Sequence, residues 1–294
     1  MIPCLRVQRR NCRWFLRSRL ANISAAGDFL TYTPVEGFFG VETFNYTIKF
    51  KGAMTAFSWA SLADGSIETR KLGSCYGRGS CLNTRVRMSS ENHKLLESLY
   101  PTRFFYQSFF SEGPVPRTIA FEKREKKNKS EYQPYGYRHK LVTISKDGSQ
   151  ATYLELWSKG ESLSAAEAKL VSTDHNGGQT PAVRNRKTSQ IEKNALDRWA
   201  MIHTARFLPY SQGYSKRFPG TNGKDRMSYD VSLAGTETLE ARGRKYDAWK
   251  VSIVETKKGK KQPTLYLWIS QDEEHVPLQV EMDESIGKLR FYLK

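Results

Sequence analysis

Residues that could act in catalysis or metal binding are few and widely separated in this sequence. Its five histidines lie far apart in sequence, and none belongs to a recognised metal-binding or nucleophile motif. The densest group of titratable side chains runs from Asp272 to His275, between two apolar segments. These types suit acid–base catalysis, but a tight polar turn uses the same residues, and we favour the turn. The sequence therefore predicts no catalytic residue and a protein that is not an enzyme.

Cysteines offer a second kind of chemistry. Cys75 and Cys81 lie in the glycine-rich segment GSCYGRGSCLN, which can close as a small disulfide ring in an oxidising compartment. The alternative is a pair of reduced, unrelated thiols in a flexible loop. A zinc site is disfavoured, because zinc needs about four ligands and no second cysteine pair or nearby histidine cluster completes the set. We expect no metal and no other cofactor.

The net positive charge of the chain indicates which classes of partner it could bind. The chain has 294 residues and a formal net charge of +17, so nucleic acid, anionic lipid and acidic polysaccharide are all electrostatically plausible. The positive charge is divided among Arg6–Arg19, Lys123–Lys129 and Lys257–Lys261. We therefore expect polyanion binding to be weak and nonspecific, and we interpret Lys123–Lys129 as a solvated hairpin tip. No apolar run approaches the roughly 18 residues that cross a bilayer, so no transmembrane segment is predicted.

The elements that must position these residues are mostly strands. Apolar residues alternate with polar ones in several segments, at 44–50, 227–233, 249–253, 278–282 and 289–293. A period of two is typical of strands with one buried face. The sequence predicts a mainly β fold, an antiparallel meander that forms a strongly curved sheet or partial barrel with one or two short packed helices. Asp64-Gly65 is expected to form a turn between two strands.

The predicted organisation has three parts. Residues 1–30 are arginine-rich and are interpreted as a disordered or misassigned leader. Residues 31–172 form an N-terminal β region. Residues 190–294 form a helix followed by a β meander, which we expect to be continuous with the first region as one domain.

Ser189 and Glu192 form a capping box, which predicts a helix from Ile191 to Phe207. One face of this helix is apolar, and His203 beside it is expected to be a packed residue. The strand predicted at 264–270 is apolar on both faces and needs two covers. We therefore expect the helix to cover the C-terminal sheet, with any ligand cavity between them or in the concavity of the sheet.

Several aromatic residues are candidates for the core or for an apolar cavity. They are Phe44, Tyr46, Trp59, Trp199, Trp249, Trp268 and Phe291. Core packing is the ordinary explanation for such residues. A stacking platform for single-stranded nucleic acid is the alternative, since bases stack on aromatic rings beside Lys and Arg.

The C-terminal motifs GTETLEARGRKYDAWKVSI, LYLWISQDEEHVPLQVE and SIGKLRFYL together resemble the bacterial envelope family Domain of Unknown Function 3108. The resemblance is best over residues 190–294. It rests on the helix end at Arg206 and on family-like turn and packing residues, which here are Ser270, Asp272, Pro277 and Gly287. Gln271 departs from the family pattern, where an acid is usual.

The resemblance implies an exported, β-rich protein of the bacterial periplasm or cell envelope, although no signal peptide is visible in this chain. It transfers no catalytic residues. The favoured function is a non-enzymatic protein whose curved sheet holds a lipid or another amphipathic ligand. The alternative is a basic protein that binds nucleic acid or acidic polysaccharide. The sequence predicts no oligomeric state.

Overall fold

Antiparallel strands dominate the structure, a computed structural model that describes residues 21–26, 29–34, 40–52, 55–94, 97, 102–113, 116–126, 137–158, 183–284 and 287–294. The strands before the helix are β1 (Ala21–Ala26), β2 (Phe29–Pro34), β3 (Val41–Gly52), β4 (Ala60–Leu72), β5 (Cys81–Ser89), β6 (Arg103–Ser111), β7 (Thr118–Lys126), β8 (Tyr137–Ile144), β9 (Gln150–Ser158) and β10 (Val183–Gln190). β1 and β2 form a separate two-stranded sheet, and among the described strands they pair only with each other. Residues 1–20 of the predicted leader lie outside the described residues.

Within the described residues, the helix α4 spans Arg198–Ala205. The strands after it are β11 (Ser215–Thr221), β12 (Arg226–Ala241), β13 (Arg244–Lys257), β14 (Lys260–Lys261), β15 (Leu265–Ser270), β16 (Pro277–Glu284) and β17 (Gly287–Leu293).

One antiparallel sheet runs through both groups of strands, in the order β10-β9-β8-β7-β6-β5-β4-β3-β17-β16-β15-β13-β12-β11, with β14 paired to β13. The last strand of the chain, β17, pairs with β3, so that Phe291 lies opposite Ile48. This pairing joins the two meanders into one sheet. The predicted fold class, a mainly β protein with a curved antiparallel sheet and a short helix, is confirmed.

The alternation seen in the sequence marks the inner face of the sheet. In β3, Phe44, Tyr46, Ile48 and Phe50 are buried, whereas the residues between them are partly or fully exposed. β12 begins in the same way, with Met227 and every second residue to Val231 buried. Burial of these apolar side chains on one face selects the register, because a slip of one residue would turn them all to solvent.

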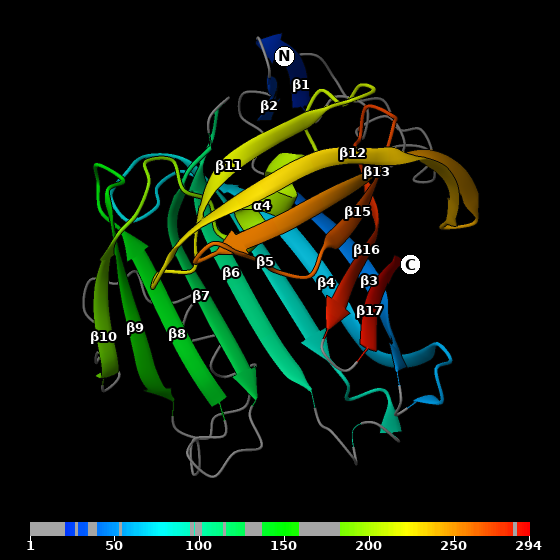
Figure 1. Ribbon diagram of the computed structural model, residues 1–294, viewed down its shortest axis with the longest axis horizontal. Helices are drawn as coiled ribbons and strands as arrows, with labels where there is room; N and C mark the ends of the chain where they lie inside the picture. The colour runs from blue at the N-terminus through cyan, green and yellow to red at the C-terminus, as the bar shows by residue number, and fades with distance from the viewer. Residues whose placement is uncertain are drawn as a thin grey trace, which may run out of the picture.

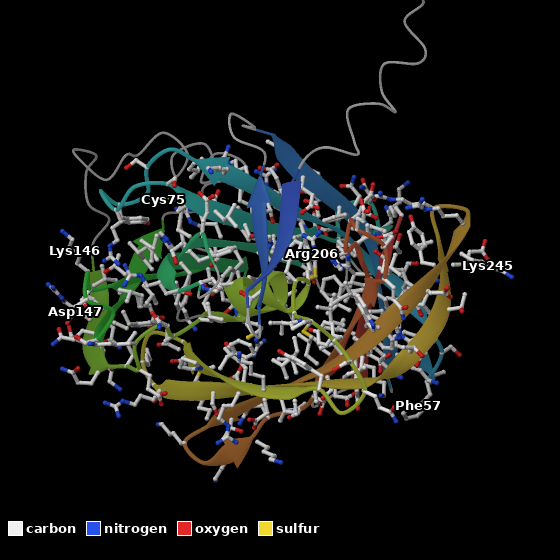
Figure 2. All side chains as sticks on the ribbon, turned by 90° about the horizontal axis from the view of Figure 1, so that it is seen from above. Phe57, Cys75, Lys146, Asp147, Arg206 and Lys245 are labelled. Carbon is white, nitrogen blue, oxygen red and sulfur yellow. A yellow bond between two sulfur atoms is a disulfide. The ribbon has the colours of Figure 1, made fainter. Side chains whose placement is uncertain are left out.

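The sheet folds over so that its two halves face each other with α4 between them (Figure 1). Seen from above, the helix lies enclosed by strands (Figure 2). Every residue of α4 from Trp199 to Ala205 is buried. The predicted single apolar stripe is therefore wrong as a description of this helix, because α4 packs against both halves of the sheet and not against the C-terminal half alone.

The segment between β10 and α4 joins the outer strand β11 to the interior strand β7. Leu196 forms a parallel bridge with Gly220 of β11. Next to it, the N–H of Thr118 in β7 donates a hydrogen bond of 3.1 Å to the Ala195 carbonyl oxygen. The segment thus connects β11 with β7, and these bonds hold the start of the helix inside the sheet.

Two local predictions are wrong. Asp64-Gly65 does not form a turn but lies within β4, opposite Thr47 and Tyr46. Gly65 is needed there for close packing, since a Cβ would lie 2.9 Å from Ile48 Cδ1 and 3.1 Å from the Arg87 carbonyl oxygen. The Ser189 capping box does not start a helix either. Ser189 lies in β10, and its hydroxyl donates to the Lys224 carbonyl oxygen at 2.9 Å.

Candidate ligand cavity

Asp197 fixes the start of α4. It is the N-cap residue, and its carboxylate accepts hydrogen bonds from the Trp199 and Ala200 N–H groups at 3.0 and 3.3 Å. The sheet provides further donors, which are the hydroxyls of Ser108 at 2.5 Å, Thr118 at 2.8 Å and Tyr106 at 3.2 Å. Burial raises the pKa of Asp197 above its usual value, against the lowering effect of the Ser108 and Thr118 bonds. The cap therefore ties the helix to β6 and β7.

Arg206 fixes the other end of the helix. Its guanidinium forms a bidentate ion pair with Glu42 of β3, at 2.7 and 2.9 Å. It also donates to the carbonyl oxygens of His275 and Glu274, at 2.8 and 3.2 Å. The arginine singled out by the family resemblance thus joins the helix end, β3 and the turn between β15 and β16.

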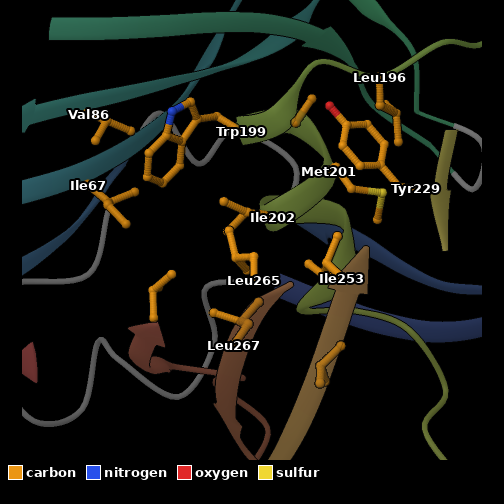
Figure 3. Close-up of a cluster of buried hydrophobic side chains, with 14 of the residues drawn as sticks. Ile67, Val86, Leu196, Trp199, Met201, Ile202, Tyr229, Ile253, Leu265 and Leu267 are labelled. Carbon is orange, nitrogen blue, oxygen red and sulfur yellow. The ribbon is translucent and has the colours of Figure 1, made fainter. Parts of the chain in front are cut away.

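With both ends of α4 held, one face of the helix borders a cavity of about 230 Å³. The lining comes from α4, β12, β13, β15, β16 and the segment before β15, and comprises Arg198, Met201, Ile202, Tyr229, Ile253, Glu255, Gln262, Pro263, Leu265, Met282 and Asp283. Figure 3 shows Met201 beside Tyr229 and Ile202 facing Leu265 and Leu267. The apolar part of the wall is therefore built by the helix and the facing strands together.

Charged groups lie on the same lining. Arg198 Nη2 is 2.9 Å from Glu255 Oε2, and half of the Arg198 side chain is exposed to solvent. Asp283 lies 3.0 Å from Lys288 Nζ. The charges are thus paired, which suits a cavity that takes an apolar group inside and leaves a polar group near the solvent-exposed side.

The aromatic residues predicted from the sequence to form the core or line a cavity lie mostly in the main core. Those in the main core are Phe44, Tyr46, Trp199, Trp268 and Phe291. Trp249 is partly buried and packs against this core, and the half-buried Trp59 lies under the Arg290 guanidinium at 4.4 Å. None of these seven residues lines the cavity. Sequence reasoning named large aromatics, whereas the lining combines five aliphatic or methionine side chains with Pro263, the ring of Tyr229 and four charged or amide side chains.

β15 is covered on both faces, as the sequence predicts for 264–270. On the inner face, Leu265 and Leu267 are buried near Ile202 of α4 (Figure 3). On the outer face, Lys250 lies over the rings of Tyr266 and Trp268, at 5.4 and 5.0 Å. The second cover is therefore a cationic side chain and not a second helix.

The family-like residues form turns and close contacts. Ser270 Oγ donates to Asp272 at 2.6 Å and accepts from the Val276 N–H at 2.7 Å, which confirms the predicted polar turn before β16. The Pro277 carbonyl oxygen accepts the Tyr46 hydroxyl at 2.7 Å. Gly287 has a φ of 151°, and a Cβ there would collide with the Lys51 carbonyl oxygen.

A disulfide joins Cys75 and Cys81, with the Cα atoms 6.0 Å apart. Both cysteines are buried and pack with Ile119, Leu72 and Phe109. The loop between them carries Tyr76, whose ring meets Phe109 edge to face at 5.3 Å. The disulfide therefore ties this loop to the start of β5, and packing against Phe109 and Ile119 places it beside β6 and β7.

A buried polar cluster lies on β6, β7 and β8, and the sequence did not indicate it. Glu122 is 1% exposed and contacts His139 Nε2 at 2.5 Å and Arg124 Nε at 2.8 Å. Gln107 donates to it at 2.9 Å. Burial by itself raises the pKa of Glu122, but His139 and Arg124 outweigh burial and lower it. The solvated interpretation of Lys123–Lys129 is wrong at Arg124, which this cluster buries.

The described residues contain no group of three or more His, Cys, Asp or Glu side chains placed to hold a metal ion. Within the same part of the chain, no helix has the length and hydropathy needed to span a bilayer.

His203 is a packed helix residue, as predicted, with its ring 5.1 Å from that of Phe110 and 5.3 Å from that of Phe207.

Comparison with curated proteins gave no match. Among solved structures, the crystal structure of a beta-barrel-like protein of Domain of Unknown Function DUF1849 from Brucella abortus is similar, with a TM-score of 0.44 and 10% sequence identity. The alignment covers 87% of this chain and 96% of that chain. Residues 160–294 match the family described as Protein of unknown function (DUF3108), which confirms over this segment the resemblance predicted from the sequence.

Proposed function

We propose that this protein is a non-enzymatic binding protein of the bacterial cell envelope that holds a small amphipathic ligand in the cavity beside α4. The observation that carries the proposal is the lining of the cavity. Its inner wall contains Met201, Ile202 and Leu265, whereas Arg198 and Glu255 stand on the same lining with solvent access. A ligand with one apolar and one polar end matches this division.

The size of the cavity limits the ligand. Sites for complete drug-sized molecules usually measure about 300–1,000 Å³, and this cavity measures about 230 Å³. It suits one short apolar chain or ring. Methionine side chains at positions 201 and 282 adapt to irregular shapes, which favours a class of related apolar groups over one rigid molecule.

The disulfide supports the proposed location. Disulfides persist in oxidising compartments such as the bacterial periplasm and are rare in the reducing cytosol. Cys75 and Cys81 are bonded and buried here. The bonded pair is therefore consistent with an exported protein.

The proposal is tested with octanol, octanoate and octylamine, which share one chain and differ in the charge of the head. Their binding is measured by displacement of a fluorescent apolar probe from the purified protein. We expect the parent to bind at least one of them and Met282→Trp to weaken that binding by about tenfold or more, because the indole occupies the cavity.

Met88→Trp is the matched control. Met88 and Met282 are both partly buried and packed against the core, but only Met282 lines the cavity. Met88→Trp should bind the octyl compounds like the parent. Absence of binding to all three compounds, or equal binding by Met282→Trp and the parent, would exclude this cavity as the ligand site.

A further inference from the structure

Cations from distant parts of the sequence meet at one end of the sheet. Arg186 and Lys187 of β10 are exposed. The turn between β11 and β12 is fastened to this strand, since Lys187 Nζ donates to the Lys224 carbonyl oxygen at 3.1 Å. Arg226 Nε also donates to the Gln190 carbonyl oxygen at 3.2 Å. β10 and the β11–β12 turn therefore form one surface.

The same turn contacts the hairpin of β13 and β14. The Asp225 carboxylate lies 3.2 Å from Lys257 Nζ and 3.4 Å from Lys258 Nζ. Lys258, Lys260 and Lys261 are exposed. We call the surface formed by segments 183–190, 222–226 and 257–261 the basic end. These segments contain nine Lys or Arg residues and a single acid, Asp225.

The basic end borders the cavity. Glu255 on the cavity lining comes two residues before Lys257, and the lining residues Gln262 and Pro263 follow Lys261 directly. The lysines at 257–261 therefore lie in a hairpin whose two ends both line the cavity. A surface that attracts the basic end would lie close to the cavity.

We propose that the basic end docks the protein onto an anionic lipid bilayer, with the cavity beside the lipid surface. Attachment follows from charge, because basic side chains near an anionic bilayer are attracted within about a Debye length. The role of the nearby cavity in this arrangement rests on the proposed function, whereas the attachment itself does not. The segments of the basic end contain no Phe, Tyr or Trp. They therefore lack the rings on which single-stranded nucleic acid stacks.

The test is cosedimentation with vesicles of phosphatidylglycerol and phosphatidylcholine, and with vesicles of phosphatidylcholine alone. We expect the full chain to bind the anionic vesicles only. The triple variant Lys258→Glu, Lys260→Glu, Lys261→Glu should lose about 100-fold in affinity or more, since each cation contributes about fivefold. A series with Gln at the same positions should lose less, and added salt should weaken binding of the parent.

The matched control reverses three cations at the β12–β13 turn, Arg242→Glu, Arg244→Glu and Lys245→Glu. All three are exposed, and Figure 2 shows Lys245 at the far end of that hairpin. This control should keep most of the vesicle binding at the same net charge. Equal losses in the two triple variants, equal binding to neutral vesicles, or binding to duplex DNA without binding to anionic vesicles would overturn the proposal.

The cavity variant separates this inference from the proposed function. Met282→Trp should bind anionic vesicles like the parent while it loses the octyl compounds. Vesicle binding that survives without any octyl binding leaves the docking surface intact and removes the proposed ligand function. Octyl binding without vesicle attachment would support the proposed ligand function and reject the docking surface.

Discussion

Arg206 and Glu42 form a bidentate ion pair across 164 residues of sequence, with N–O distances of 2.7 and 2.9 Å. The guanidinium is buried between the rings of Phe44 and Phe207, each at 5.0 Å. Glu42 belongs to the first strand of the large sheet, and Arg206 is the C-cap residue of the helix. The pair therefore locks the helix to the strand at which the two meanders join.

Loss of this pair should destabilise the fold. Glu42→Gln removes the carboxylate charge that faces buried Arg206 and leaves the guanidinium with neutral acceptors, and we expect a cost of about 2–3 kcal/mol. Chemical denaturation of parent and variant measures it. The control is Asp230→Asn, which breaks the exposed Arg217–Asp230 pair at 2.6 Å and should cost less than about 1 kcal/mol. Equal costs at the two sites would contradict a locking role for Arg206 and Glu42.

Trp199 tests the packing of α4. Its side chain is 7% exposed, its ring lies 6.4 Å from Tyr106, and it points toward Ile67 and Val86 of the N-terminal strands (Figure 3). Trp199→Ala should cost about 3–5 kcal/mol, as for a buried aromatic residue. Trp59→Ala, at a half-buried loop position, should cost clearly less. A Trp199→Ala variant that melts like the parent would show that the helix does not pack there.

The disulfide should contribute measurable stability. By the loop-entropy estimate, closing the short ring between Cys75 and Cys81 stabilises the fold by about 2–3 kcal/mol. Cys75→Ser with Cys81→Ser removes the bond and should lower the free energy of unfolding by that amount. Intact mass and thiol counting before reduction verify the starting state. Four free thiols in protein taken from the periplasm would refute the bond.

His203 predicts a pH dependence. Burial, together with the charge of Arg206, lowers the pKa of His203 well below the ordinary value of 6.5. The unfolded chain therefore binds a proton at a higher pH than the folded chain does. Stability is full above about pH 6.5 and falls as the pH is lowered below it, by up to about 1.4 kcal/mol per pH unit for this group. His203→Phe should reduce the slope in denaturation series between pH 7 and pH 5, and an unchanged slope would assign the dependence to other groups.

The strands of this protein can be predicted from patterns of neighbouring residues in the sequence. The alternation from Phe44 to Phe50 reports which face of β3 is buried, and it does so within one element. The Ser270 turn is equally local, since Ser270, Asp272 and Val276 bond to one another. Period, turn chemistry and fold class can be derived from neighbours in the chain because the physical causes act over a few residues.

Contacts between distant segments decided the helix, the cavity and the basic end. Asp197 has no capping-box partner in sequence, and three of its hydrogen-bond donors lie 79 to 91 residues away. The sequence predicts that Ser189 caps a helix, but it pairs with β9 as part of β10. The hydrogen bonds between these strands satisfy the backbone there. The cavity lies where Ile202, Leu265 and Met282 come together. The turn at Asp225 connects the cations of β10 with those of the β13–β14 hairpin. A sequence shows which side chains are apolar or charged, but folding of the sheet over α4 determines which of them face one another.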